Sequence, residues 1–592
     1  MIMMSGMETV SHNVQVCIVG GGLSGLCAAL ACARHGGKVL LMHDRPVLGG
    51  NASSEIRMHI CGAHGENNLE TGIIEELLLE NQYYNPDKIY SIWDSVLYGA
   101  ARQQPGLEIL FNCACMTGQM EGDRLAEITG YQTTTQQFHR VEAAIFIDCS
   151  GDSVLAPITG APYRHGREGR DEFGESIAPV DADAKTMGMS CLIQARKEQT
   201  ESVFTPPEWA RKMSIEDLAP YRIPTMDNPM ENFWYLELGG ENHTIRDTEQ
   251  LRDQLLAEAL GLWDWIKNAP ENKEKNRFWK LDWLGFLPGK RESRRYVGAY
   301  VMHQKDVRDG GRFDDIIAYG GWTMDDHHPG GLYTKEPPTI FHPAPSPFGI
   351  PYRCLYSNSV PNLMFAGRNI SVTHSALSAT RVMATCALLG QAAGTAAAIA
   401  VCNDQLPADV YEKHLRQLQA MLMEDDCYLP GVVRPVNELT AAAAMTVGGS
   451  NASVLCNGID RPVGDEDNGV YLNLQEPLEI SFDCPRKISG LRLVFDSDLN
   501  RETLPENQVG IHHFMPTNRR WNDPVSCVPK TLVRDFEIQV LYDGVWQFAK
   551  QMKHNHQRLC RISVDATVAA LRIVPKSTWG AEKAHLFAVD LY

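Results

Sequence analysis

The sequence lacks a Cys-x-x-Cys pair, an internal repeat and an excess of positive charge. Its 16 cysteines are scattered singly, with Cys113 and Cys115 the closest pair, which argues against a zinc or iron–sulfur centre. Lys and Arg number 54 against 73 Asp and Glu, a net charge of −19. Nucleic acid and anionic membrane surfaces are therefore disfavoured as partners, because phosphate binding requires a basic patch.

No secretory signal is expected, since residues 1–12 contain no basic region followed by a long apolar one. Because the cysteines are single and lie in apolar runs, we expect a reduced, cytoplasmic protein. The most apolar stretch, residues 376–401, contains Arg381 and Gln391 and is interpreted as a buried helix, so no membrane insertion is expected. A chain of 592 residues, 44% apolar and 21% charged, is predicted to be soluble, with about two to four domains.

Residues 14–50 contain the motif around which the chain is organised. A β-branched run at 14–19 leads into Gly20-x-Gly22-x-x-Gly25, a helix to Arg34 and a second apolar run at 39–42. In a dinucleotide-binding fold the first glycine permits the tight turn, the second admits the pyrophosphate and the third allows helix and strand to pack closely. The helix N-terminus would attract the phosphates. The motif predicts a dinucleotide site without separating NAD from FAD.

The acid that binds the adenosine ribose should follow the second strand of this unit. That position falls on His43 or Asp44. We favour Asp44, because a carboxylate can accept hydrogen bonds from both ribose hydroxyls.

Two further segments add to the predicted site. Residues 46–60 form a loop of glycines and small polar residues that can lie against a flat ligand. The apolar run 143–147 ends in Asp148-Cys149-Ser150-Gly151-Asp152, which predicts a carboxylate at the carboxyl edge of the sheet, where ligands bind in open α/β folds.

Residues 166–344 are polar and rich in proline and tryptophan, and predict an inserted α+β domain that covers the cofactor. The charge cluster 289–295 includes Arg291, which could bind a carboxylate or phosphate, although a solvated turn is an equal alternative. The polar cluster 325–331 contains two Asp and two His but no third spaced ligand. We therefore predict no metal site.

The remainder of the chain returns to α/β character before changing to strands. Residues 351–401 contain a strand that ends at Gly367, a loop with His374 and the small-residue helix. We predict a discontinuous FAD- or NAD-binding domain at 12–165 and 345–404, a substrate domain at 166–344 and a helical linker at 405–449. Short alternating strands from 450 to 592 predict an all-β sandwich.

These motifs together resemble the FAD-dependent oxidoreductases of the FAD_oxidored type, which are distant relatives of fumarate reductase and glutathione reductase flavoproteins. The resemblance covers about residues 14–400 in collinear order. It rests on the glycine motif, residues 45–57, residues 147–152, and 366–368 with 381–383 and 390–394. The family pattern usually has Thr-Gly-Asp where this chain has Ser150-Gly151-Asp152, and an acid of the glutamate type where this chain has His43-Asp44. The C-terminal strands are similar to galactose-binding-like modules that accompany many carbohydrate enzymes.

The resemblance implies an α/β Rossmann-like fold, FAD as cofactor and a set of contacts. Gly20, Gly22 and Gly25 would hold the pyrophosphate and Asp44 the adenosine ribose. The other implied contacts are Arg45, Gly50, Asn51 and Ser53 along the pyrophosphate and flavin, Asp152 and Gly367 near the ribityl chain, and Gln391 and Gly394 near the flavin ring.

A flavin enzyme of this kind takes its redox chemistry from the cofactor. We predict dehydrogenation of a polar small molecule such as a sugar, glycoside or polyol, with hydride transfer to flavin N5 and an unidentified electron acceptor. His374 is the first candidate base and His59 the second, because the ordinary pKa of histidine suits proton transfer near neutrality. Arg381 or Arg291 would orient an anionic substrate.

Two other functions remain open from the sequence. One is an enoyl or keto reductase that uses reduced FAD and a separate electron donor, because no second Gly-x-Gly-x-x-Gly motif is present for a nicotinamide nucleotide. The other is a carbohydrate-binding protein with a vestigial flavin domain.

Overall fold

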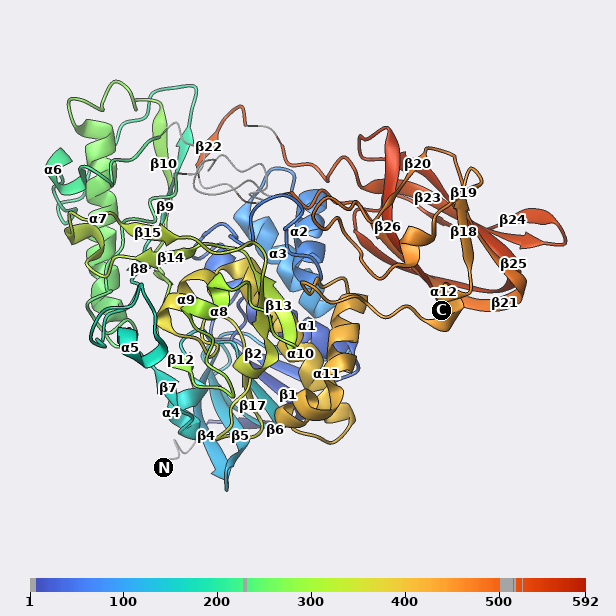
Figure 1. The fold of residues 1–592 in the computed structure, drawn as a ribbon. Coiled ribbons are helices and arrows are strands. Elements are labelled where there is room, and N and C mark those ends of the chain that lie inside the picture. Colours follow the sequence, from blue (N-terminus) through green and yellow to red (C-terminus); the bar gives the residue numbers. More distant parts are fainter. Residues whose placement is uncertain (1–6, 227–230, 501–514, 516–517, 524) are drawn as a thin grey trace. The chain divides into compact units, whose positions relative to one another are not determined.

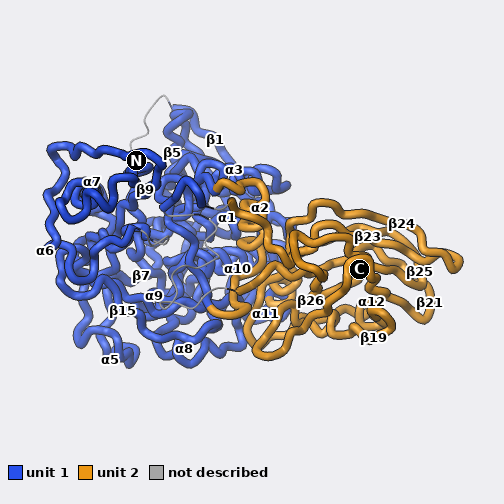
Figure 2. The backbone as a smooth tube through the Cα atoms, turned by 90° about the horizontal axis from the view of Figure 1, so that it is seen from above, with its two compact units in different colours: residues 1–64, 88–418, 502–524 blue, residues 65–87, 419–501, 525–592 orange. Residues whose placement is uncertain are grey.

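The computed structural model describes residues 7–226, 231–500, 515, 518–523 and 525–592. They form two compact units (Figure 2). The first takes its described residues from 1–64, 88–418 and 502–524, and the second from 65–87, 419–501 and 525–592. The first unit is mixed α/β and the second contains an antiparallel sheet. Residues 65–87 therefore belong with the C-terminal strands and not with the glycine motif that precedes them in the chain.

The first unit is built on one sheet whose strand order places the glycine motif at its centre (Figure 1). In order across the sheet, the strands are β3 (Leu107–Leu110), β2 (Val39–Met42), β1 (Thr9–Val19), β6 (Gln137–Asp148), β5 (Arg124–Gln132) and β4 (Cys113–Glu121), and β17 (Leu363–Phe365) also pairs with β6. Strand β1 is parallel to both β2 and β6. The sequence predicts a hairpin from the runs 128–132 and 138–141 across a polar turn. The structure confirms it, because β5 and β6 pair antiparallel with Ile128 opposite Val141.

Helices α1 (Leu23–Arg34) and α10 (Met383–Cys402) pack against each other beside this sheet (Figure 1). Helix α10 is long and apolar enough to cross a membrane, but 89% of its apolar window is buried inside the protein. One such helix is weak evidence for a span, because a buried core helix has the same composition. The single helix predicted over 376–401 is interrupted, since α9 (His374–Thr380) ends before Arg381 and α10 begins after Val382.

The region between Asp152 and β17 consists of short strands and helices. Its largest helix is α7 (Thr248–Asn268), which confirms the amphipathic helix that the sequence predicts over 247–268. It buries Leu255 and Trp263 in a separate apolar core. The other elements are α4 (Leu155–Thr159), β7 (Tyr163–Arg164), α5 (Arg170–Phe173), β8 (Met189–Ser190), β9 (Ile193–Lys197), α6 (Ile215–Leu218), β10 (Trp279–Leu284), β11 (Gly289–Lys290), β12 (Arg295–Tyr296), α8 (Gln304–Arg308), β13 (Ile316–Gly320), β14 (Met324–His327), β15 (Thr339–His342) and β16 (Phe348–Pro351). Helix α3 (Tyr90–Arg102) and strand β22 (Arg519–Arg520) complete the first unit.

The second unit contains an antiparallel sheet and its own apolar core. Its strands are β18 (Ala444–Val447), β19 (Ser450–Asn451), β20 (Val470–Asn473), β21 (Leu478–Phe495), β23 (Val533–Tyr542), β24 (Val545–Met552), β25 (Leu559–Thr578) and β26 (Lys583–Leu591). Strands β21 and β25 pair along most of their length through two register shifts. The sequence pattern predicts each as two shorter strands, at 478–482 and 488–495 for β21 and at 559–564 and 570–574 for β25. Helices α2 (Ile73–Tyr84) and α12 (Glu438–Ala441) belong to this unit, and α11 (Pro407–Glu424) contains the boundary between the units.

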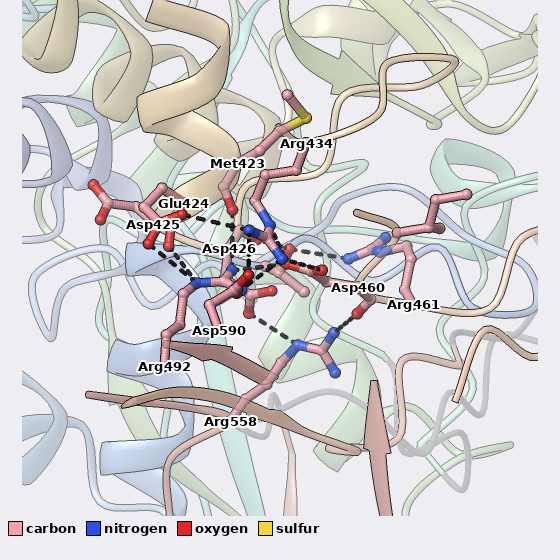
Figure 3. A network of polar contacts seen from close by, with 12 residues as sticks. Met423, Glu424, Asp425, Asp426, Arg434, Asp460, Arg461, Arg492, Arg558 and Asp590 are labelled. Atoms are coloured by element: carbon pink, nitrogen blue, oxygen red, sulfur yellow. Dashed lines mark hydrogen bonds and ion pairs between the residues drawn. The ribbon is translucent and has the colours of Figure 1, made fainter. Parts of the chain in front are cut away.

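Buried arginines and carboxylates join the separate chain segments of the second unit (Figure 3). Arg492 lies 2.8 Å from Asp460 and 3.0 Å from Asp590, and Arg434 contacts the same two carboxylates at 3.1 and 2.9 Å. Arg558 lies 2.9 Å from Asp426. Each charge is paired, which offsets the cost of burying it.

Candidate active site

A cavity of about 530 Å³ in the first unit gathers most of the predicted site residues. Its wall is formed by the glycine turn, the loop after β2, the end of β6, the segment around β11, strand β14 and the residues between α9 and α10. The predicted residues that line it are Gly20, Gly22, Asp44, Arg45, Gly50, Asn51, His59, Asp152, Arg291, Gly367 and Arg381.

The three motif glycines have different surroundings. Gly20 has a φ of +101°, and an added Cβ would meet the backbone of Cys149. Gly25 is packed so closely that a Cβ would clash with the carbonyl of Gly20. Gly22 precedes α1, and the nearest atom to a Cβ there is the Cα of Gly50 at 3.9 Å. The open side of the turn is therefore at Gly22, at the N-terminus of α1, where a pyrophosphate is expected.

His43 and Asp44 differ in what their side chains contact. The His43 ring is buried, its Nδ1 accepts the N–H of Gly21 at 3.0 Å and its Nε2 lies 2.9 Å from the carbonyl of Val47. The Asp44 carboxylate lies 3.3 Å from Nδ1 of His43, but its side chain is 60% exposed and lines the cavity. Asp44 is thus available to a ligand, whereas His43 holds the glycine turn in place.

The loop after β2 approaches the glycine turn directly. Gly22 and Gly49 form an isolated parallel bridge, and Asn51 Nδ2 donates to the carbonyl of Lys290 at 3.2 Å. Ser53 is fully buried, and its hydroxyl donates to the carbonyl of Gly50 at 2.7 Å. Ser53 therefore stabilises the conformation of the loop.

Asp152 is the centre of a charged cluster at the end of β6. Lys290 Nζ lies 2.7 Å from its carboxylate, Arg368 Nη2 lies 2.8 Å away and the Ser293 hydroxyl donates at 2.8 Å. Burial alone would raise the pKa of Asp152, but the two cations outweigh it and hold the pKa well below its usual value.

The donors around the cavity fit a bound dinucleotide. Arg45 Nη1 and Arg368 Nε are buried and have no hydrogen-bond partner among the described residues. An anionic pyrophosphate would supply the missing acceptors. Together with the open space at Gly22 and the exposed carboxylate of Asp44, these donors match the chemistry of FAD at its phosphate and adenosine end.

Gln391 and Gly394 lie in the buried helix α10. A Cβ at Gly394 would clash with the carbonyl of Ala28, so this glycine faces α1. Its placement serves the packing of the two helices, and the interpretation of these two residues as flavin contacts stays a prediction.

The candidate catalytic residues occupy two separate places. Arg291, Arg381 and His59 line the cavity, and Asn232 Nδ2 donates to His59 Nδ1 at 3.2 Å. His374 lies outside the lining, with Nδ1 2.9 Å from Glu292 and Nε2 3.0 Å from Asp326. The pKa of His374 is about 10, because the two carboxylates outweigh the lowering effect of burial. A charged imidazolium that donates from both nitrogens is unsuited to accept a proton.

His327, which lines the cavity, belongs to a histidine–carboxylate pair that the sequence did not reveal. His327 Nδ1 is 2.6 Å from Glu237 Oε2, and His327 Nε2 is 3.3 Å from Asp325. Glu237 also accepts the N–H of Gly188 at 2.6 Å and lies 3.4 Å from Arg291. Asp325 and His327 belong to the polar cluster noted in the sequence, but Glu237 is 90 residues away. Its one sequence signal is an acid within the apolar run 233–238.

Within the described parts of the chain, no group of three or more His, Cys, Asp or Glu side chains is placed to hold a metal ion. Asp325 instead pairs with Arg381, 3.1 Å away, and accepts from the Thr339 hydroxyl.

The sequence matches a family model over more than half of its length. A family model described as FAD dependent oxidoreductase matches residues 15–422. No curated protein matches the sequence.

Solved structures give weaker matches. A geranylgeranyl bacteriochlorophyll reductase-like protein from Thermoplasma acidophilum is 12% identical over 70% of this chain and 88% of its own, with a TM-score of 0.30. L-proline dehydrogenase from P. horikoshii is 16% identical, and the match covers only 24% of either chain, with a TM-score of 0.16. A family 32 carbohydrate-binding module from Streptococcus pneumoniae EndoD is 16% identical over 25% of this chain and 94% of its own, with a TM-score of 0.18. Scores this low carry no argument about function.

Proposed function

The chain belongs to the FAD dependent oxidoreductase family, and from that premise we propose that it dehydrogenates a polar, hydroxyl-bearing small molecule such as a sugar, glycoside or polyol. It is an FAD-dependent enzyme. Bound FAD supplies the hydride-accepting chemistry, and the protein supplies orientation and proton transfer.

The observation that carries the proposal is the His327–Glu237 pair beside two arginines in the cavity wall. Burial would raise the pKa of Glu237, but Arg291 and His327 hold it below its usual value, so Glu237 is ionised. An ionised Glu237 favours a proton on Nδ1 of His327. Nε2 lies 3.3 Å from Asp325, which is the longer of the two contacts, and the proposal requires that the substrate hydroxyl replaces Asp325 there before its proton moves to Nε2. The imidazolium formed in this way would lie between Glu237 and Asp325, which stabilise its charge.

His59 supports a complementary role. Asn232 Oδ1 accepts the N–H of Trp234 at 3.1 Å, which turns the Asn232 amide nitrogen toward His59 Nδ1. With Nδ1 as acceptor, the ring proton of neutral His59 is on Nε2. This tautomer favours a hydrogen bond from His59 to a substrate oxygen over proton abstraction.

Arg381 and Arg291 are proposed to orient an anionic group of the substrate. Arg381 Nε is buried and has no hydrogen-bond partner among the described residues. A carboxylate on a sugar acid or hydroxy acid would satisfy it. Neutral sugars and their acids should therefore both be examined as substrates.

The polar region 166–344 is proposed as the substrate domain over the FAD-binding parts, 12–165 and 345–404. Glu237, Arg291, Asp325 and His327 all come from this region, which supports the assignment. For residues 450–592 we propose a galactose-binding-like β-sandwich, supported by its antiparallel strands. Calorimetric titration of the full chain with galactose tests that part, and an absence of heat of binding would reject it. A cytoplasmic location also remains a proposal.

An enoyl or keto reductase with a separate electron donor is the second candidate. The same histidine and arginines could donate a proton and bind a carbonyl substrate, so the direction of the reaction decides between the two. Anaerobic mixing of the holoenzyme with hydroxylated compounds and, separately, with NADPH tests it. Bleaching of the flavin by a hydroxylated compound supports the dehydrogenase, whereas bleaching by NADPH alone supports the reductase. A purified protein without flavin colour would support the carbohydrate-binding alternative.

A further inference from the structure

His374 is the first residue of α9 and is held by two carboxylates. Its side chain is 5% exposed, and both ring nitrogens face acceptors, Glu292 at 2.9 Å and Asp326 at 3.0 Å. Both nitrogens can donate at once only when the ring carries two protons and a positive charge. The high pKa of His374, about 10, agrees with this geometry.

Each contact of His374 is adjacent in the chain to a residue of the cavity wall. Glu292 follows Arg291, and Asp326 stands between Asp325 and His327. Helix α9, which begins at His374, ends one residue before Arg381. One buried imidazolium thus joins three chain segments that each carry a cavity residue.

The carboxylates that contact His374 depend on its positive charge, although other cations lie nearby. Arg295, which is fully buried, lies 3.2 Å from Glu292 and 2.8 Å from Glu168. Glu168 in turn accepts the backbone N–H of His374 at 2.8 Å. The other ionisable groups that act on these carboxylates are Arg164, Arg167, His165 and His342. Without the charge of His374, Glu292 and Asp326 would both be buried with less compensation.

We propose that His374 is a positioning residue, which fixes Arg291, Arg381 and the Asp325–His327 segment relative to one another through its hydrogen bonds to Glu292 and Asp326. This inference rests on the proposed function, because it assigns those cavity residues to the substrate. A positioning role differs from that of a base, since the proton of His374 stays on the ring throughout.

The test compares His374→Gln and His374→Lys with a matched control, His585→Gln. His585 is also a buried histidine between two carboxylates, Asp496 at 3.1 Å and Asp467 at 3.2 Å, but it lies in the second unit. With a substrate that bleaches the flavin, we expect His374→Gln to bind FAD but to lose about 100-fold in kcat, because small misplacements of reacting groups have effects of this size. His374→Lys retains a cation that can reach both carboxylates and should recover most of that loss. His585→Gln should lower the unfolding temperature and leave kcat unchanged.

Two outcomes would overturn the proposal. One is an unchanged kcat in a folded His374→Gln variant, and the other is an equal loss of kcat in the His585→Gln control. If no hydroxylated compound bleaches the flavin, the proposed function fails, and a crystal structure of His374→Gln then decides the positioning role. We expect the His327–Glu237 and Arg291–Glu237 distances, 2.6 and 3.4 Å in the parent, to change. Unchanged distances would reject the role whatever the reaction is.

Discussion

The Nδ1 atom of His43 lies 3.0 Å from the backbone nitrogen of Gly21 and accepts its hydrogen bond. The other ring nitrogen contacts the carbonyl of Val47. His43 therefore connects the glycine turn to the loop after β2, and the neighbouring carboxylate of Asp44 faces the cavity. The two candidates for the ribose position thus have separate tasks.

Replacement of Asp44 by Ala should weaken FAD binding about tenfold to a hundredfold, the usual effect of losing hydrogen bonds to a charged group. The dissociation constant can be measured from the fluorescence of released flavin. Asp123→Ala is the matched control, because Asp123 is exposed in the turn between β4 and β5. An unchanged dissociation constant in the Asp44 variant would remove Asp44 from the ribose site.

Alanine at Gly22 and at Gly25 should have different effects. At Gly25 the added methyl group meets the carbonyl of Gly20, so the variant should lose about 1–3 kcal/mol or more of folding stability. At Gly22 the φ of −64° and the open space admit alanine. The Gly22→Ala apoprotein should therefore keep its unfolding temperature but bind FAD weakly. Equal stability losses in the two apoproteins would contradict this assignment.

Substitution of His327 or Glu237 by Gln should slow flavin reduction by substrate about 100- to 10,000-fold, the usual contribution of a positioned acid or base. Stopped-flow absorbance measures the rate. His328→Gln serves as control, since the Nδ1 atom of His328 accepts the N–H of Gly330. Rates equal to that of the control would assign proton transfer to another group.

Glu75 should make the second unit less stable as the pH rises. Its burial raises the pKa to about 7 from an ordinary 4.5, despite the nearby Arg558. A raised folded-state pKa contributes stability that is present below about pH 4.5 and lost as the pH rises through about 7. Glu75→Gln should flatten the decline in unfolding temperature over this range by about 2–4 °C.

Glu80 on the same helix provides the opposite case. The hydrogen bond with His556 lowers the pKa of Glu80, so its contribution is present above its ordinary pKa and lost as the pH falls. The same hydrogen bond raises the pKa of His556 above its ordinary 6.5. Glu80→Gln should therefore leave in place the part of the decline between about pH 4.5 and 6.5, which is assigned to Glu75. If Glu75→Gln and Glu80→Gln have the same pH profile as the parent, burial of Glu75 is not the cause.

The helices and strands that local sequence patterns specify could be predicted from the sequence. The strand, glycine turn, helix and second strand around Gly20–Gly25 form as predicted, and so do the β5–β6 hairpin and helix α7. The long strands β21 and β25 were divided in the prediction, because turn-like residues at 483–487 and 565 resemble strand ends. The structure accommodates these positions as register shifts.

Contacts between distant segments could not be predicted from local patterns. Glu237 and His327 are 90 residues apart in the chain, and no periodicity of the sequence predicts their contact. His374 follows a strand that leads to Gly367, and from the sequence it resembles a catalytic loop histidine. Its charged state is evident only from its contacts with Glu292 and Asp326. Residues 65–87 likewise join the second unit through tertiary packing that their amphipathic pattern does not specify.

The most direct test is the rate of flavin bleaching after anaerobic mixing of the holoenzyme with hydroxylated compounds, from neutral sugars and polyols to sugar acids and hydroxy acids. For a compound that bleaches the flavin, the measurement is repeated with deuterium at the carbon that bears the hydroxyl group. We predict bleaching by at least one such compound and a severalfold slower rate with deuterium, because hydride leaves that carbon. Bleaching by NADPH but by none of the hydroxylated compounds would contradict the proposed dehydrogenase.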